Sequence, residues 1–167
     1  HASTPPAFPA TARLARAIGR IHRRPFPTRI APPVRALLAS AAPHMTGPLA
    51  AVFAKVALTG PLLAQIFARL GPETNALVRT TAVITELQGA VGQNVLATSA
   101  RASLNVRLLT GDTAAAATDR IRLVIGDPLV EITVRHATDP STVSPWRGDS
   151  WRRIAGTVRD ALGESIV

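Results

Sequence analysis

Arg107 and Asn94 are the side chains best suited by type and position to hold a carboxylate. Arg107 shares one face of an alternating segment with Asn105, and Asn94 precedes it by thirteen residues, on the loop that leads into that segment. A guanidinium binds a carboxylate through two parallel hydrogen bonds, and a neutral amide can add another. We therefore expect Asn94 and Arg107 to lie near one strand end and together to hold a substrate carboxylate. The alternatives are a solvated arginine and an asparagine that serves only a turn.

The sequence predicts no self-contained metal or hydrolytic site. There is no cysteine, which excludes thiolate ligands and disulfide scaffolds. The carboxylates are few and mostly fall at expected turns or helix caps, and no nucleophile elbow, phosphate-binding loop or dinucleotide fingerprint occurs. The histidines are scattered, without metal-ligand spacing: His1, His22, His44 and His136.

The chain is basic, with 19 Lys and Arg against 10 Asp and Glu and a formal net charge of +9. Such a charge suits acidic partners, so a stand-alone α/β nucleic-acid-binding module is one alternative, and a protein-interaction module is another. Residues 79–136 contain no aromatic side chain, although RNA-binding sheets rely on stacking aromatics. We therefore expect no nucleic-acid partner, and we interpret the arginine-rich face of the first helix as solvated.

The elements that must position these residues follow from hydrophobic periodicity and from the placement of proline and glycine. Residues 28–72 read as a helical insertion, with proline before each of three short helices. The order is helix, insertion, strand, strand, helix, strand, which is a ferredoxin-like split βαβ pattern of the α+β (α/β) class without its first strand. The expected elements outside the insertion are a helix at 9–24, strands at 79–87 and 100–108, a helix at 113–125, a strand at 129–136 and a helix from Ser150.

The insertion is apolar enough to raise the question of a membrane span. A span needs about 20 unbroken apolar residues, whereas Lys55 and the Gly60-Pro61 pair interrupt this one. We therefore predict an amphipathic helical hairpin, broken at Gly60-Pro61, and no membrane partner. No targeting peptide is visible at the first residues, which leaves the cytoplasm as the default compartment and secretion as the alternative.

Several short segments occur in the order found in the co-catalytic zinc peptidase and aminoacylase family, and they resemble its carboxypeptidase S-like branch. The chain looks like the inserted dimerisation, or lid, domain of that family. The segments are HASTPP at 1–6, RTTAVIT at 79–85, NVL at 94–96, LNVRL at 104–108, TGDT at 110–113 and STVSP at 141–145.

This resemblance implies a division of the chain and an activity. Residues 1–140 would form the lid, with the insertion at 28–72, and residues 141–167 would begin the returning catalytic segment. The whole enzyme would hydrolyse amide bonds of peptides or N-acyl amino acids that carry a free carboxylate. Its two zinc ions would be held by a catalytic domain outside this sequence, so this part alone would bind no catalytic metal and hydrolyse nothing.

The resemblance also implies roles for three residues and an assembly. His1 matches a histidine that hydrogen-bonds the reaction's oxyanion, usually in the partner subunit's active site. Asn94 matches an asparagine that contacts substrate there, and Arg107 matches an arginine that holds the substrate's carboxylate. A homodimer is expected, because exposed strand edges invite pairing. The family's first lid strand, which would precede His1, has no counterpart here, so the two strands that flank it would lack a common neighbour.

Overall fold

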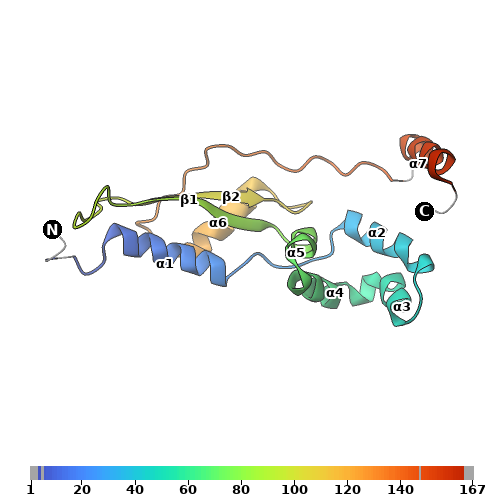
Figure 1. Cartoon of the computed structure of the whole chain (residues 1–167), viewed down its shortest axis with the longest axis horizontal. Coiled ribbons are helices and arrows are strands. Elements are labelled where there is room, and N and C mark those ends of the chain that lie inside the picture. Colours follow the sequence, from blue (N-terminus) through green and yellow to red (C-terminus); the bar gives the residue numbers. More distant parts are fainter. Residues whose placement is uncertain (1–3, 5, 147, 164–167) are drawn as a thin grey trace.

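The computed structural model describes residues 4, 6–146 and 148–163, and it shows a mixed helix and strand fold (Figure 1). The described residues form a two-stranded antiparallel sheet and several helices, which confirms the predicted α+β class. The elements are α1 (Ala10–Arg23), α2 (Pro32–Ala41), a 3₁₀ turn η1 (Ala42–His44), α3 (Pro48–Ala54), α4 (Val56–Leu70), α5 (Pro72–Val78), β1 (Thr81–Gln88), β2 (Arg101–Arg107), α6 (Ala114–Ile125) and α7 (Asp149–Leu162).

Helices α1 and α6 pack against one face of the hairpin formed by β1 and β2. Their cluster of buried side chains includes Ala17 of α1 and Ile121 and Ile125 of α6, and the partly buried Leu104 and Val106 of β2 pack against it. Alternation along β2 directs Leu104 and Val106 to this side and Asn105 and Arg107 to the other, where both are exposed. The predicted strand and helix periodicities are confirmed here.

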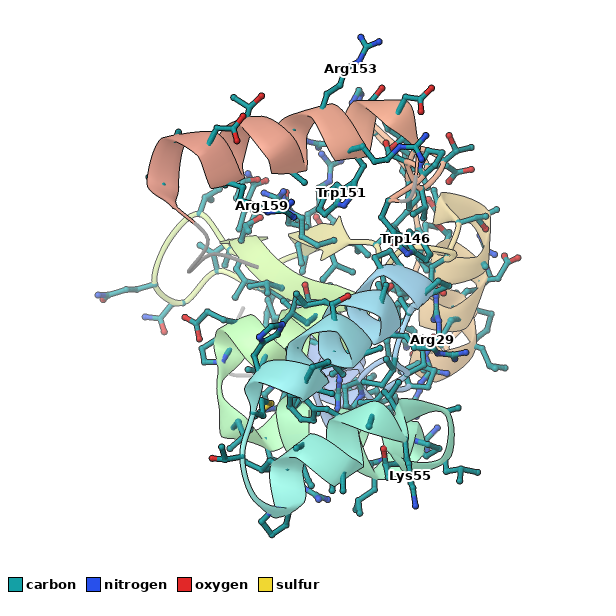
Figure 2. The ribbon with its side chains drawn as sticks, turned by 90° about the vertical axis from the view of Figure 1, so that its right-hand side faces the viewer. Arg29, Lys55, Trp146, Trp151, Arg153 and Arg159 are labelled. Carbon is teal, nitrogen blue, oxygen red and sulfur yellow. The ribbon has the colours of Figure 1, made fainter. Side chains whose placement is uncertain are left out.

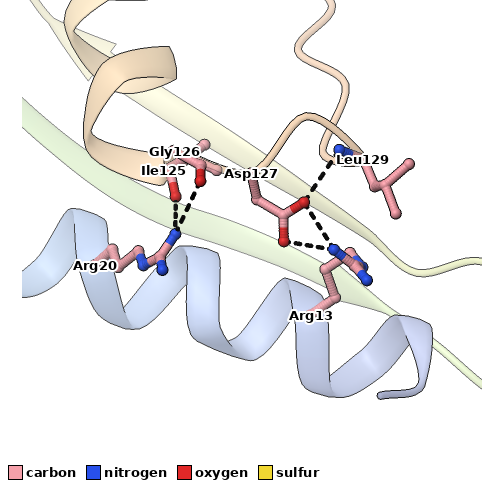
Figure 3. Close-up of polar contacts among 6 residues, drawn as sticks. All are labelled: Arg13, Arg20, Ile125, Gly126, Asp127 and Leu129. Atoms are coloured by element: carbon pink, nitrogen blue, oxygen red, sulfur yellow. Dashed lines mark hydrogen bonds and ion pairs between the residues drawn. The ribbon is translucent and has the colours of Figure 1, made fainter. Parts of the chain in front are cut away.

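Polar contacts join α1 to the end of α6 (Figure 3). Arg13 donates from one Nη to both carboxylate oxygens of Asp127, at 2.7 and 2.6 Å. Arg20 donates to the carbonyl oxygens of Ile125 and Gly126. These carbonyls belong to the last turn of α6 and its cap, where a cation is favourable. The basic face of α1 is therefore partly used in holding α6, although it was predicted to be solvated.

The helical insertion has a core of its own. Buried residues from the linker, α2, α4 and the end of α5 form this cluster: Ile30, Leu38, Val56, Leu63, Ala64 and Val78. The predicted break at Gly60-Pro61 is wrong, because the chain bends by 112° at Lys55 (Figure 2) and α4 continues through Pro61. The Thr59 hydroxyl stabilises the bend by donating to the carbonyl of Val52 at 2.7 Å.

The helical region extends past the predicted end of the insertion at residue 72, because a fourth helix, α5, was not predicted. Gly71-Pro72 was interpreted as the end of the helical series, but Pro72 occupies the first turn of α5, where its missing N–H costs nothing. Thr74 then donates its hydroxyl to the carbonyl of Phe67 at 2.7 Å, which joins α5 to α4. No single helix among the described residues is long and apolar enough to cross a membrane. Helices α3 and α4, which are bent sharply relative to each other, reach such a length and apolar composition only when taken together.

The predicted strand at 129–136 does not form. Val130 and Ile132 pack against the cluster shared by α1, α6 and the hairpin, as the alternation predicts. No described strand lies beside them, however, and the sheet contains only β1 and β2. A strand needs a neighbour to bond its backbone, and the expected first strand of the ferredoxin-like sheet is not among the described residues. The segment is therefore extended without a ladder.

Helix α7 confirms the helix predicted from Ser150, and it follows a long extended segment (Figure 1). Its apolar side chains recur at helical spacing and all remain exposed: Trp151, Ile154, Val158 and Leu162. In Figure 2, Arg153 points away from the rest of the chain, and Trp151 lies on the opposite side of the helix.

Candidate functional site

The hairpin places Arg107 at one end of the sheet. Arg107 is opposite Thr81 in the ladder, and Gln88 is opposite Arg101 at the other end. The Arg107 side chain is exposed, and no hydrogen bond or ion pair joins it to another residue in the described ranges. A guanidinium in this situation keeps all of its donors available for an anionic ligand.

A buried polar network fixes the turn that follows Arg107. Thr80, 1% exposed, accepts a hydrogen bond from the backbone N–H of Leu109 at 2.8 Å. Its hydroxyl donates to the carboxylate of Asp112. Arg29 forms an ion pair with the same carboxylate at 2.8 Å and donates to the carbonyl of Thr110 at 2.9 Å. The strand end that carries Arg107 is therefore held by side chains from three separate segments.

Sequence reasoning missed Arg29 and Thr80 as supports for Arg107. Thr80 lies in the RTTAVIT segment, and Asp112 lies in the TGDT segment, so both fall in motifs that carried the family resemblance. Arg29 has no such signal, because its partners Thr110 and Asp112 are about eighty positions further along the chain. Thr113 caps α6 by accepting from the N–H of Ala116 at 3.2 Å, at the start of the helix predicted over 113–125.

Asn94 lies in the loop between the strands, at the opposite end of the hairpin. It is exposed, and its φ of 59° places it in the left-handed region, which asparagine tolerates better than most residues. Gly89, at the start of this loop, lies close to Thr11 in the first turn of α1: a Cβ on Gly89 would be 3.2 Å from the Thr11 Cγ2. The loop therefore lies at the same end of the molecule as the beginning of α1 (Figure 1).

Asn94 and Arg107 do not meet within one chain. The six residue steps of β2 separate Arg101 from Arg107 by about 20 Å, and Asn94 lies in the loop beyond Arg101. The expectation that the two side chains lie near one strand end is wrong, because the loop before β2 is at the start of the strand and Arg107 is at its end. A substrate contact by each residue separately stays a prediction.

Two further expectations concern the N-terminus and metal ions. His1 lies outside the described residues. Within residues 4, 6–146 and 148–163, no three His, Asp or Glu side chains come close enough to hold a metal ion. These residues therefore do not fit the zinc centre of the family that the sequence resembles.

The surroundings of Asp127 shift the pKa of its carboxyl. The backbone N–H of Leu129, which donates to Asp127 at 3.1 Å, is the largest cause that lowers the pKa of this carboxyl below its usual 3.8. Burial opposes the effect, and the guanidinium groups of Arg13 and Arg20 add to it. The role of Asp127 is structural, because Arg13, Arg20 and Leu129 all surround it where α1 meets the end of α6.

Comparison with known proteins gives a consistent family and several relatives. A family model described as a peptidase dimerisation domain matches residues 1–133. The chain is 32% identical over 146 residues to an N-fatty-acyl-amino acid synthase/hydrolase PM20D1 from Xenopus tropicalis, and 30% identical to the Homo sapiens protein of the same name. These matches cover 87% of this chain and 28% and 29% of those relatives.

A second kind of relative matches over the full length of the chain. It is named "Probable carboxypeptidase S-like 2", from Dictyostelium discoideum, and is 25% identical over 168 residues, which is 32% of its length. The chain thus spans about a third or less of the curated relatives it matches. No solved structure matches it significantly.

Proposed function

This chain belongs to the family of peptidase dimerisation domains, and on that premise we propose that it is the lid of a zinc-dependent hydrolase that cleaves amide bonds of peptides or N-acyl amino acids. The two zinc ions would be held by a catalytic domain outside this sequence, and the lid would contribute substrate contacts. The observation that carries the proposal is the match over residues 1–133, which includes Asn94 and Arg107.

The names of the relatives support a substrate with a free carboxylate. An N-fatty-acyl-amino acid ends in a carboxylate, and a carboxypeptidase acts on the end of a peptide that carries one. Arg107 suits this group, because it is exposed on a strand end fixed by Thr80, Asp112 and Arg29. The held strand end fixes the backbone from which the Arg107 guanidinium reaches out, which reduces the freedom lost when it binds a carboxylate.

The opposite placement of Asn94 and Arg107 supports a dimeric site. If both residues contact the same carboxylate, they must come from two different subunits, because about 20 Å of strand separates them within one chain. A dimerisation domain provides the second subunit. In this arrangement Arg107 acts from one chain, and Asn94, together with His1 as the oxyanion donor, acts from its partner.

Helix α7 supports the proposed boundary near residue 140. Its exposed apolar row has no cover among the described residues, as expected for a helix that packs into another domain. We propose that residues 141–167 begin the catalytic segment and that α7 buries this row there.

The role of Arg107 can be tested in the complete enzyme. Arg107→Ala should lower kcat/KM by about 100-fold for substrates with a free carboxylate, mainly through KM, and should change little for the matching amide-blocked substrates. Arg69→Ala, which removes an exposed arginine from α4, is the matched control. An equal loss on both substrate types would contradict the assignment.

Mixed dimers test the two-subunit site. Subunits with Arg107→Ala and subunits with Asn94→Ala should each give weak activity alone. A mixed dimer restores one intact site, because that site takes Arg107 from one chain and Asn94 from the other. If both residues served the same site from one chain, mixing would restore nothing, and the proposed arrangement would be wrong.

A further inference from the structure

A cavity beside the free edge of β1 has the chemistry of an anion site. Its volume is about 430 Å³, within the usual range for small-molecule sites. It lies between the end of α1, the linker that follows, α5, the first half of β1, and α6. Three arginines line it, Arg24, Arg79 and Arg120, together with His22, and no aspartate or glutamate does. Neither Asn94 nor Arg107 lines the cavity, so the site is independent of the function proposed above.

Two of the arginines have a buried donor without a partner. The Nε atoms of Arg79 and Arg120 are both inaccessible to solvent and make no hydrogen bond within the described part of the chain. Buried polar groups are normally paired, and leaving a donor of a charged group unpaired is costly. Because these two Nε atoms are closed off from solvent, an anion in the cavity would accept hydrogen bonds from the terminal N–H groups of Arg79 and Arg120, and its charge would stabilise both guanidinium groups.

Arg120 is held in place for such a role. Its Nη2 donates to the carbonyl of Pro25 at 2.9 Å, and its guanidinium carbon lies 5.4 Å from the centre of the Phe26 ring. Both interactions fix the plane of the guanidinium. Arg79 immediately follows α5 and precedes the buried Thr80, so its backbone position is also fixed.

The rest of the lining is apolar. Phe26, Ile121 and Val124 are buried and form part of the wall, and Ile21 and Ala82 add to it. Ile21, Ala82 and Val83 leave apolar surface open to the cavity. A simple inorganic anion would leave that surface in contact with water, whereas an aliphatic tail would cover it and would itself be removed from water. We propose that this cavity binds an organic anion with a carboxylate head and an aliphatic body.

The first test uses octanoate as the probe, with octanol and inorganic phosphate as comparisons, on the full chain. Octanoate should bind saturably and shift the amide NMR signals of Ala76, Thr80 and Thr81, which line the cavity. Octanol should bind at least about tenfold more weakly because it lacks the charge-assisted hydrogen bonds. Phosphate should also bind at least about tenfold more weakly because it buries no apolar surface.

Any of three results would overturn the proposal. Octanol could bind as tightly as octanoate, phosphate could bind as tightly as octanoate, or octanoate could shift the amide signals of exposed residues of α4 instead of those that line the cavity. The first would remove the need for a charged head and the second the need for an aliphatic body. The third would place the ligand elsewhere.

Variants test the cavity without depending on Arg120, which also has structural contacts. Asn75→Asp adds a negative charge to the lining and should weaken octanoate binding about tenfold, whereas Gln65→Glu adds the same charge on the exposed part of α4 and should not. Arg79→Gln should also weaken binding about tenfold, and Arg69→Gln should leave it unchanged. Unchanged affinity in Asn75→Asp, with the native amide spectrum retained, would exclude this cavity as the site.

Discussion

Helices α1 and α7 have the same length and the same kind of amphipathic sequence, yet they differ in what covers their apolar faces. Each has 14 residues. In α1, Ala17 is buried and Ile21 packs beside it, against a cluster that includes Ile121 of α6. In α7, Trp151 and Ile154 are 53% and 60% exposed. Periodicity therefore determines where a helix forms, while the availability of a partner determines whether its face is buried.

The largest expected effect contrasts a side chain of α6 that packs in the cluster with α1 and a side chain in the exposed apolar row of α7. Ile121→Ala removes a side chain that is 7% exposed and packs in the cluster with α1, so the free energy of unfolding should fall by about 3 kcal/mol. Ile154→Ala on α7 should change it by no more than about 0.5 kcal/mol. Urea unfolding followed by circular dichroism measures both. A large loss for Ile154→Ala would show that α7 is covered in solution.

The glycines that end α6 and α7 provide a smaller contrast. Gly126 has a φ of 53° and Gly163 a φ of 81°, and a side chain at either position is strained. Gly126→Ala should lower the free energy of unfolding by about 1 kcal/mol, and Gly126→Asn by less, because asparagine tolerates this conformation. Gly163→Ala should reduce only the helix content at the end of α7. Equal global losses at both glycines would mean that the two helices unfold together.

The ion pairs of the two helices should differ in their dependence on pH. The folded state lowers the pKa of Asp127 below 3.8, so its stabilising effect is complete above that pH and is lost as the pH falls through the lower folded value. Asp127→Asn should therefore reduce the fall in Tm on acidification. The control is Asp149→Asn, which removes an exposed pair with Arg152 within α7 and should leave the profile unchanged. Identical profiles for the wild type and Asp127→Asn would contradict the role of this carboxylate.

The smallest expected effect is in tryptophan emission. Both tryptophans, Trp146 and Trp151, lie in the C-terminal segment and are 41% and 53% exposed. Unfolding of the cluster between α1 and α6 should therefore change circular dichroism strongly and tryptophan emission only slightly. A large emission shift at the same urea concentration would show that α7 is packed against the rest of the chain. In the complete enzyme, the proposed burial of α7 should produce that shift.

The elements that could be predicted from the sequence are those whose signals are local. The alternation around Leu104 and the cap at Thr113 act within a few residues, and both the strand and the helix formed as expected. Residues 129–136 show the same alternation but form no strand, because pairing depends on a neighbour that may lie anywhere in the sequence. The bend at Lys55 is local but was predicted at the wrong place: the Thr59 hydroxyl donates to the carbonyl of Val52, seven residues earlier, and α4 continues through the Gly60-Pro61 pair.

For the candidate site, the sequence predicted what each residue can bind but not where the residues lie relative to one another. The types of Asn94 and Arg107 suggested what each side chain can bind, but their separation depends on the direction of β2. Arg107 is opposite the first residue of β1, so it lies far from the loop that contains Asn94. The cavity beside β1 brings together residues from α1, α5 and α6, and no local pattern links Arg79 to Arg120.

The two hydrophobic clusters differ in the length of chain that must be closed to form them. The cluster of the insertion joins residues between Ile30 and Val78, whereas the contact of α1 with the end of α6 joins Arg13 to Asp127 across 114 positions. Closing a longer loop costs more entropy, and such contacts form later. We therefore expect the insertion to assemble early in folding, as a local nucleus, and α1 to dock on α6 afterwards.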